Sequence, residues 1–151
     1  MTDARTDAGT AAKTDAEGRT LSVVMERDLP HTPEKVWRAL TEPALIEAWL
    51  MKNAFAPVVG HRFDLSADWG SIDCEVRAVE PRSRLVYSWD AGDLRSLVDW
   101  TLTPTDGGTR LRMEQTGFRA DQPQYYGGAK AGWPRFLDGL ESVLAGLDRD
   151  G

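Results

Sequence analysis

Residues that commonly carry metal chemistry are few in this sequence. His31 and His61 are its only histidines, and Cys74 is its only cysteine. Zinc sites take several such residues at short spacings, and no such spacing occurs here. We therefore expect no metal centre and no cofactor. His31 follows a proline and is expected in solvent. His61 begins a strand, so its ring lies either in solvent or at a cavity mouth.

Nucleophilic catalysis finds equally little support. The sequence contains no Gly-x-Ser-x-Gly motif and no glycine-rich phosphate-binding motif. Cys74 alternates with apolar residues along a predicted strand, so we expect a small core residue rather than a nucleophile. A lone cysteine permits no intramolecular disulfide, which fits a reducing, bacterial-type cytoplasm.

Three polar residues occupy apolar strand faces and are candidates for contacts inside a cavity. Arg27 either pairs with an anionic group or lies at the strand end with its charge in water. Tyr87 either bonds a neighbouring side chain or offers its hydroxyl to a ligand. Gln115 shares its face with Leu111 and Met113. No pair of titratable groups converges clearly, so we expect a binding protein rather than an enzyme.

Aromatic side chains are the strongest feature, with six tryptophans in 151 residues. Each is explained by core packing, but large rings around a curved sheet also form stacking surfaces for a flat apolar ligand. Trp69 beside Gly70 is expected at the cavity rim. Tyr125 and Tyr126 precede two glycines and form a candidate gate. The residues predicted to face inward or lie between helices are Trp37, Trp49, Trp89, Trp100 and Trp133.

Six segments alternate apolar and polar residues with period two, which predicts strands joined by short polar turns. Consecutive strands with such turns form an antiparallel meander. Pro104 to Gly108 gives the clearest hairpin turn. The predicted strands are 21–29, 62–65, 72–78, 85–90, 97–102 and 109–116.

Two short helices and one long helix are predicted. Thr32 can cap a helix that begins at Pro33, and Pro43 ends it and starts a second. A regular amphipathic stripe from Trp133 to Leu147 predicts the long helix, starting near Gly132. Segment 119–131 is ambiguous, because Gly127 and Gly128 weaken a helix there.

The remaining composition narrows the function. Residues 1–19 repeat Thr-Asp-Ala and contain no apolar residue besides Met1 and alanines, which predicts a disordered tail before one domain at 20–149. A net charge of −6 argues against nucleic acid, although Arg110 and Arg112 make a local basic pair. No apolar run is long enough for membrane insertion, and no secretory signal precedes the domain.

Several short motifs occur in a specific order and spacing from about residue 21 to 147, although each is weak alone. They are 33–43 (PEKVWRALTEP), Trp49, Gly60 with Phe63, 80–85 (EPRSRL) with Trp89, 107–111 (GGTRL), and Gly132-Trp133 with Phe136, Leu137 and Leu140. Together they resemble the START-related helix-grip superfamily (SRPBCC, Bet v-like). Within it, the sequence is similar to the subfamily named for the activator of the ninety-kilodalton heat-shock protein's ATPase.

The resemblance implies an α+β helix-grip fold, in which a six-stranded curved antiparallel sheet wraps around a long C-terminal helix. The two short helices lie between strands one and two. Helix-grip relatives include lipid carriers, polyketide cyclases and chaperone regulators. They are often dimers, so the resemblance is compatible with a homodimer, while the sequence itself leaves the oligomeric state open.

We therefore predict a binding protein for a small apolar ligand held between the sheet and the last helix. One alternative is a chaperone-regulator-like interaction module, and a second is a cyclase or hydrolase using the same cavity. No catalytic residue is assigned. The predicted ligand-binding residues are Trp49, Phe63, Tyr87, Trp89, Trp100, Met113, Gln115, Trp133 and Phe136, with Arg27 and His61 beside them.

Overall fold

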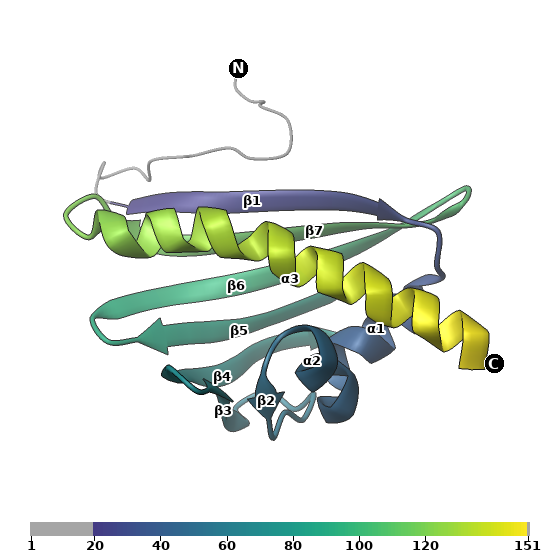
Figure 1. The fold of residues 1–151 in the computed structure, drawn as a ribbon, viewed down its shortest axis with the longest axis horizontal. Helices are drawn as coiled ribbons and strands as arrows, with labels where there is room; N and C mark the ends of the chain where they lie inside the picture. Colours follow the sequence, from purple (N-terminus) through teal and green to yellow (C-terminus); the bar gives the residue numbers. More distant parts are fainter. Residues whose placement is uncertain (1–19, 151) are drawn as a thin grey trace, which may run out of the picture.

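The computed structural model describes residues 20–150, and the predicted disordered tail at 1–19 lies outside them. Within this part the chain forms one antiparallel sheet and three helices (Figure 1). The strands are β1 (Thr20–Leu29), β2 (Lys52–Asn53), β3 (Arg62–Ala67), β4 (Gly70–Glu80), β5 (Arg84–Ala91), β6 (Leu94–Thr105) and β7 (Gly108–Arg119). The helices are α1 (Pro33–Thr41), α2 (Pro43–Trp49) and α3 (Pro123–Asp150).

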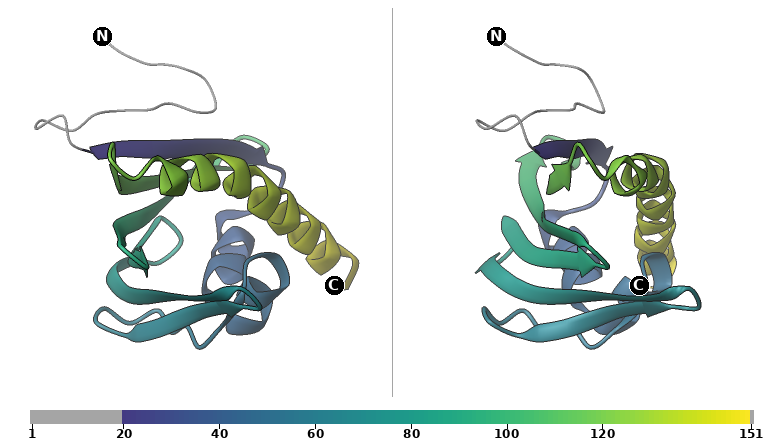
Figure 2. Two further views of the ribbon diagram at one scale, coloured as in Figure 1. Left: turned by 60° about the vertical axis from the view of Figure 1, so that its left-hand side comes forward. Right: turned by 90° about the vertical axis from the view of Figure 1, so that its left-hand side faces the viewer.

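The sheet order is β1-β7-β6-β5-β4-β3-β2, so the strands from β3 to β7 form a meander and β1 pairs with β7. The sheet curls strongly, and α3 crosses its concave side (Figure 2). The short helices α1 and α2 lie at one end of that concavity (Figure 1). This arrangement confirms the predicted α+β helix-grip fold.

The described sheet has seven strands, whereas the sequence predicted six. The additional strand β2 has two residues, Lys52 and Asn53, which pair with Ser66 and Leu65 at the end of β3. Two residues are too few to show the alternation by which strands are recognised. The predicted order of the longer elements is unaffected.

The first helix begins as its sequence predicted. The hydroxyl of Thr32 accepts a hydrogen bond from the backbone N–H of Lys35 at 3.2 Å, and Pro33 occupies the first turn. Val36, Ala39 and Leu40 are buried, so one face of α1 packs into the core. Pro43 then starts α2 immediately after α1 ends.

Helix α3 begins at Pro123, well before the predicted start near Gly132. Both Gly127 and Gly128 lie inside it. Each glycine costs about 1 kcal/mol of helix propensity, a penalty that tertiary packing can exceed. Tyr125, Tyr126 and Ala129 pack against the core and supply that compensation. Pro134 interrupts the backbone hydrogen bonding, and the axis of α3 changes direction between its two halves (Figure 2).

A bulge in β7 sharpens the curvature beside the helix. Leu21 pairs with Phe118 and Ser22 with Thr116, so Gly117 is an extra residue on β7. Gly117 has φ +107°, and a Cβ atom built there would lie 2.5 Å from the carbonyl oxygen of Arg95. Only glycine fits both the backbone conformation and this close approach.

Replacing Gly117 with alanine should therefore destabilise the protein by about 1–3 kcal/mol. Urea unfolding followed by tryptophan fluorescence measures this change. Gly60→Ala is an informative comparison, because Gly60 also has positive φ but a Cβ atom placed there would have no neighbour within 4 Å. Equal losses in the two variants would contradict the role of the close approach.

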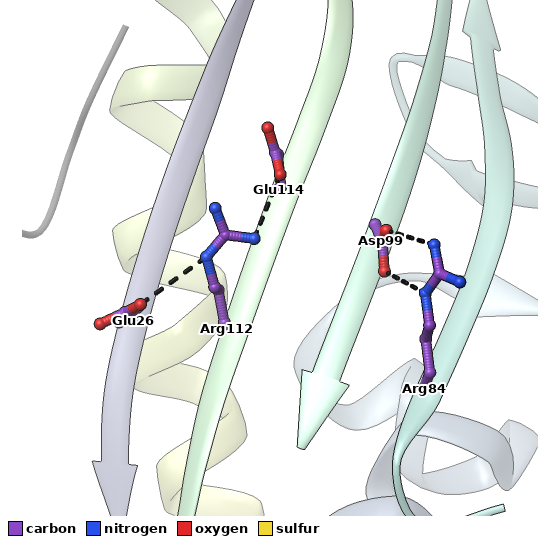
Figure 3. A network of polar contacts seen from close by, with 5 residues as sticks. All are labelled: Glu26, Arg84, Asp99, Arg112 and Glu114. Atoms are coloured by element: carbon purple, nitrogen blue, oxygen red, sulfur yellow. Dashed lines mark hydrogen bonds and ion pairs between the residues drawn. The ribbon is translucent and has the colours of Figure 1, made fainter. Parts of the chain in front are cut away.

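Charges on the outer face of the sheet are paired across strands (Figure 3). Asp99 and Glu114 lie directly opposite each other on β6 and β7, an unfavourable placement for two carboxylates. Arg84 donates to both oxygens of Asp99 at 3.2 and 2.9 Å. Arg112 donates to Glu114 at 3.1 Å and lies 3.7 Å from Glu26. The arginines thus offset the repulsion between the two carboxylates.

The basic pair noted in the sequence is neutralised in the same way. Arg112 contacts two carboxylates, and Arg110 pairs with Asp28 at 2.9 Å. Neither side chain contributes to an isolated basic patch.

No helix among residues 20–150 has the length and apolar character needed to cross a bilayer.

Candidate functional site

A pocket of about 380 Å³ lies between the N-terminal half of α3 and the concave face of the sheet. Its walls are mostly apolar, and six of the lining residues are aromatic. The aromatic lining residues are Trp69, Trp89, Phe118, Tyr125, Trp133 and Phe136. The aliphatic ones are Met51, Ile72, Ala91, Leu94 and Ala129.

Trp133, which is 2% exposed, joins the pocket wall to the core. Its ring centroid lies 5.3 Å from that of Trp89 and 5.5 Å from that of Phe136, both of which also line the pocket. On its other side it packs edge-to-face on Trp100 at 5.6 Å. Such ring contacts hold the wall in one arrangement.

A short chain of hydrogen bonds fixes the one buried polar side chain of the described pocket lining. The indole Nε1–H of Trp133 donates to Gln115 Oε1 at 2.7 Å. Gln115 Nε2 donates to Ser96 Oγ at 2.9 Å, and Ser96 Oγ donates to the carbonyl oxygen of Trp89 at 2.5 Å. Gln115 is 1% exposed. The network therefore orients an amide within an apolar wall.

The first turns of α3 reach the hairpin between β5 and β6. Tyr125 Oη accepts a hydrogen bond from the backbone N–H of Asp93 at 3.2 Å. It also lies 2.7 Å from where a Cβ atom of Gly92 would be, so glycine is required for this contact. Tyr125 thereby closes one side of the pocket. Tyr126, its partner in the predicted gate, packs instead on Phe118 and beneath the ammonium group of Lys130.

Three residues of the pocket lining are exposed to solvent: Trp69, Gln124 and Gly128. Trp69 lies at the β3–β4 turn and is 66% exposed, which matches the predicted place at the rim. An exposed indole next to an opening provides an apolar surface at the entrance.

Small residues on α3 create the space. Gly128, Ala129 and Gly132 lie on the side of the helix that faces the pocket. A Cβ atom at Gly128 would contact nothing within 4 Å, and one at Gly132 would only reach Phe136 at 3.9 Å. Larger side chains at these positions would occupy the pocket.

Four of the predicted ligand-binding residues line this pocket: Trp89, Gln115, Trp133 and Phe136. Five others lie in the core outside its lining. Trp49 donates its indole N–H to the carbonyl oxygen of Ala39 at 2.8 Å. The others in the core are Phe63, Tyr87, Trp100 and Met113.

Tyr87 and Trp100 form a hydrogen bond with each other inside the core. The indole N–H of Trp100 donates to Tyr87 Oη at 3.0 Å, both residues are buried, and burial raises the pKa of the Tyr87 phenol. Met113 lies opposite Trp100 in the β6–β7 register. Phe63 packs edge-to-face on Tyr87 at 5.6 Å. These contacts correspond to the core-packing interpretation of each residue.

The remaining polar candidates have protein partners away from the pocket. His61 Nε2 lies 2.8 Å from the carbonyl oxygen of Ala54, and its ring stacks on Phe63.

Cys74 is 4% exposed, and its burial, together with the negative charges of nearby aspartates, raises the pKa of the thiol. Among the described residues, no cluster of three or more ligating side chains suits a metal ion.

The Arg27 side chain forms ion pairs with two residues of α3 and does not line the pocket. Its Nη1 atom lies 3.0 Å from Asp138 Oδ1 and 2.6 Å from Glu141 Oε2. Burial lowers the pKa of the guanidinium, but the hydrogen bonds and charges of Glu141 and Asp138 together outweigh this effect, so the pKa is raised overall. The charge on the apolar face is thus paired with anionic groups of the protein.

Replacing Arg27 with methionine should cost at most about 1 kcal/mol, because Asp138 is 73% exposed and solvent screens the pair. The loss should shrink in concentrated salt. Ligand affinity should remain within about twofold of the wild type, because the Arg27 side chain does not line the pocket. Denaturant unfolding at two salt concentrations measures the first effect, and a binding titration the second. A large loss of affinity would contradict this placement of Arg27.

A family model described as activator of Hsp90 ATPase homolog 1-like protein matches residues 30–145. The chain belongs to this family. The match spans α1 to most of α3 and therefore includes both walls of the pocket. No curated protein matches the chain in a sequence search.

Solved structures with the same fold include three whose similarity is informative. Protein MLL2253 from Mesorhizobium loti is 59% identical, with a TM-score of 0.81, and the alignment covers 86% of this chain and 98% of that one. DynU16, from the dynemicin biosynthetic locus, is 27% identical with a TM-score of 0.75. That alignment covers 82% of this chain but 47% of DynU16. CalU16 from Micromonospora echinospora is 24% identical over 89% and 83% of the two chains, with a TM-score of 0.73, and shows the fold alone.

Several pocket residues of this Hsp90-activator-like chain were not predicted from the sequence. Met51 and Phe118 adjoin predicted elements but lie outside their predicted bounds. Gly128, Ala129 and Gly132 lie in or beside segment 119–131, whose structure is ambiguous from the sequence. Their signal is the spacing of small residues on one helical face, which is visible only if the helix is extended back to Pro123.

Proposed function

We propose that this protein binds a small, largely apolar molecule in the pocket between α3 and the sheet. The observation that carries the proposal is a pocket of about 380 Å³ with aromatic walls and one oriented amide. Small-molecule sites in proteins are typically concave spaces of roughly 300–1,000 Å³ with mostly apolar linings and a few placed polar groups.

The energetics of packing favour the same conclusion. Protein interiors are close-packed, and apolar space costs stability roughly in proportion to its volume. Here the space persists because α3 presents glycine and alanine at positions where larger side chains would fit. A ligand that fills the pocket would form van der Waals contacts with walls that have no packing partner in the protein alone.

The cyclase or hydrolase alternative receives less support from this pocket. Its described lining includes no aspartate, glutamate, histidine, cysteine, lysine or arginine, and Tyr125 is the only titratable side chain within that lining. General acid–base catalysis needs such groups at the reacting atoms. We therefore propose binding rather than turnover.

The chaperone-regulator alternative rests on the family name. We would test it by adding the purified chain to an Hsp90 ATPase assay, with an established activator as the positive control. A stimulation comparable with the control would favour that role over ligand binding alone.

The binding proposal is tested by native mass spectrometry of freshly purified protein, followed by extraction of any accompanying molecule. A titration with the uncharged fluorescent probe N-phenylnaphthylamine provides an independent measurement. We expect saturable binding of one probe per chain. Absence of both a co-purified molecule and saturable probe binding would count against the proposal.

A further inference from the structure

We infer that the ligand is an uncharged molecule carrying a hydrogen-bond acceptor, such as a ketone or ether oxygen, which accepts from Gln115 Nε2–H. This inference rests on the proposed binding function and specifies the chemistry of its ligand. It follows from the donors and charges of the pocket wall.

The orientation of the Gln115 amide is determined by its partners. Because the Trp133 indole can only donate, the amide oxygen must face it and the amide nitrogen must face Ser96. The Ser96 hydroxyl already donates to the carbonyl oxygen of Trp89, so it accepts from Gln115. One of the two N–H groups of the amide is thereby used.

The second N–H group of Gln115 has no acceptor among residues 20–150. The side chain is nevertheless buried, and it lines the pocket. A buried donor without an acceptor is unfavourable, whereas an acceptor supplied by a ligand would satisfy it. The pocket thus offers a donor that is already oriented.

Trp89 contributes a further indole N–H group to the pocket lining. The indole N–H groups of Trp49, Trp100 and Trp133 each donate to a protein oxygen. That of Trp89, whose residue lines the pocket, has no acceptor in the described part of the chain. Together with the Gln115 amide, this indole favours a ligand that accepts hydrogen bonds.

The charge of the ligand follows from the same wall. In the described lining no ionised side chain is present to pair with a charged ligand. Transferring an unpaired charge into an apolar site is strongly unfavourable, so charged molecules of the same shape should be rejected. An uncharged acceptor satisfies the donors without that cost.

Three probes of nearly equal shape test the inference: acetylnaphthalene, isopropenylnaphthalene and naphthoate. Each is titrated as a competitor of N-phenylnaphthylamine at neutral pH. We expect the ketone to bind about tenfold more tightly than the alkene, which lacks the acceptor. We expect naphthoate to bind at least about tenfold more weakly than the ketone.

Variants of Gln115 assign the preference to the amide. In Gln115→Met, the ratio of ketone to alkene affinity should fall close to one. Gln115→Leu also removes the donor but has a different side-chain shape, and the preference should disappear there as well. Arg27→Met changes a residue outside the pocket lining and leaves the amide network intact, so the preference should persist there. Using ratios makes the result independent of a general loss of stability.

The outcomes separate the two proposals. Equal binding of ketone and alkene by the wild type, or a preference that survives both Gln115 variants, would overturn this inference and leave the binding function standing. Tighter binding of naphthoate than of the ketone would overturn it as well. Failure of the wild type to bind any probe would remove the binding function, and this inference with it.

Discussion

Replacing Gly132 with leucine should weaken the binding of N-phenylnaphthylamine by at least about tenfold while making the protein more stable. A leucine side chain on this face of α3 would occupy the pocket, since only Phe136 lies within 4 Å of a Cβ atom placed at Gly132. Glycine in a helix interior costs about 1 kcal/mol relative to good helix formers, and the added side chain buries apolar area. The free energy of unfolding should rise by about 1–2 kcal/mol.

Gly127→Leu is the matched control for this experiment. Gly127 lies on the same helix and is exposed, and a Cβ atom placed there would have no neighbour within 4 Å, but the residue does not line the pocket. It should gain similar helix stability without losing probe affinity. Equal loss of affinity in the two variants would show that binding depends on helix rigidity rather than on the pocket volume.

Replacing Trp100 with alanine should cause the largest loss of stability, about 3–5 kcal/mol. Trp100 is fully buried and packs edge-to-face against both Trp49 and Trp133. Removing it leaves a cavity at the centre of the core and leaves Tyr87 without its indole donor. Because domains are stable by roughly 5–15 kcal/mol, we expect a variant that is only marginally folded.

Tyr87→Phe separates the hydrogen bond from the packing. It keeps the ring but removes the hydroxyl that accepts from Trp100, so it should cost about 1–3 kcal/mol. Urea unfolding followed by circular dichroism measures both variants on one scale. A loss below about 1 kcal/mol for Trp100→Ala would contradict the central position assigned to this residue.

Most of the fold was predictable because its signals are local. The alternation of buried and exposed residues in β6, such as buried Val98 and Trp100 beside the partly exposed Asp99, follows directly from the period of a strand. The cap at Thr32 was likewise predicted from residue type. The early start of α3 was not, because glycine propensity favours an end to the helix there and only contacts with the distant sheet reverse it.

The candidate site was less predictable, because a pocket forms where the side chains of α3 and of the sheet do not contact one another. Alternation placed Trp89 and Trp100 on inward faces, but it cannot tell which ring faces open space and which is covered by Trp49. Arg27 illustrates the same limit. Its partners Asp138 and Glu141 are more than a hundred residues away in the chain, and only the packing of α3 on β1 brings them together.

The burial of Cys74 makes it a reporter of opening of the domain. Its thiol is buried and has a raised pKa, so alkylating reagents should react only when β4 separates from its neighbours. If that event requires global unfolding, a molecule bound under α3 lowers the population of the reactive, unfolded state. Alkylation then slows by the factor 1 + L/Kd, where L is the concentration of the free ligand. The labelling rate of this single residue would then measure affinity without a fluorescent ligand, on protein taken directly from a crude extract.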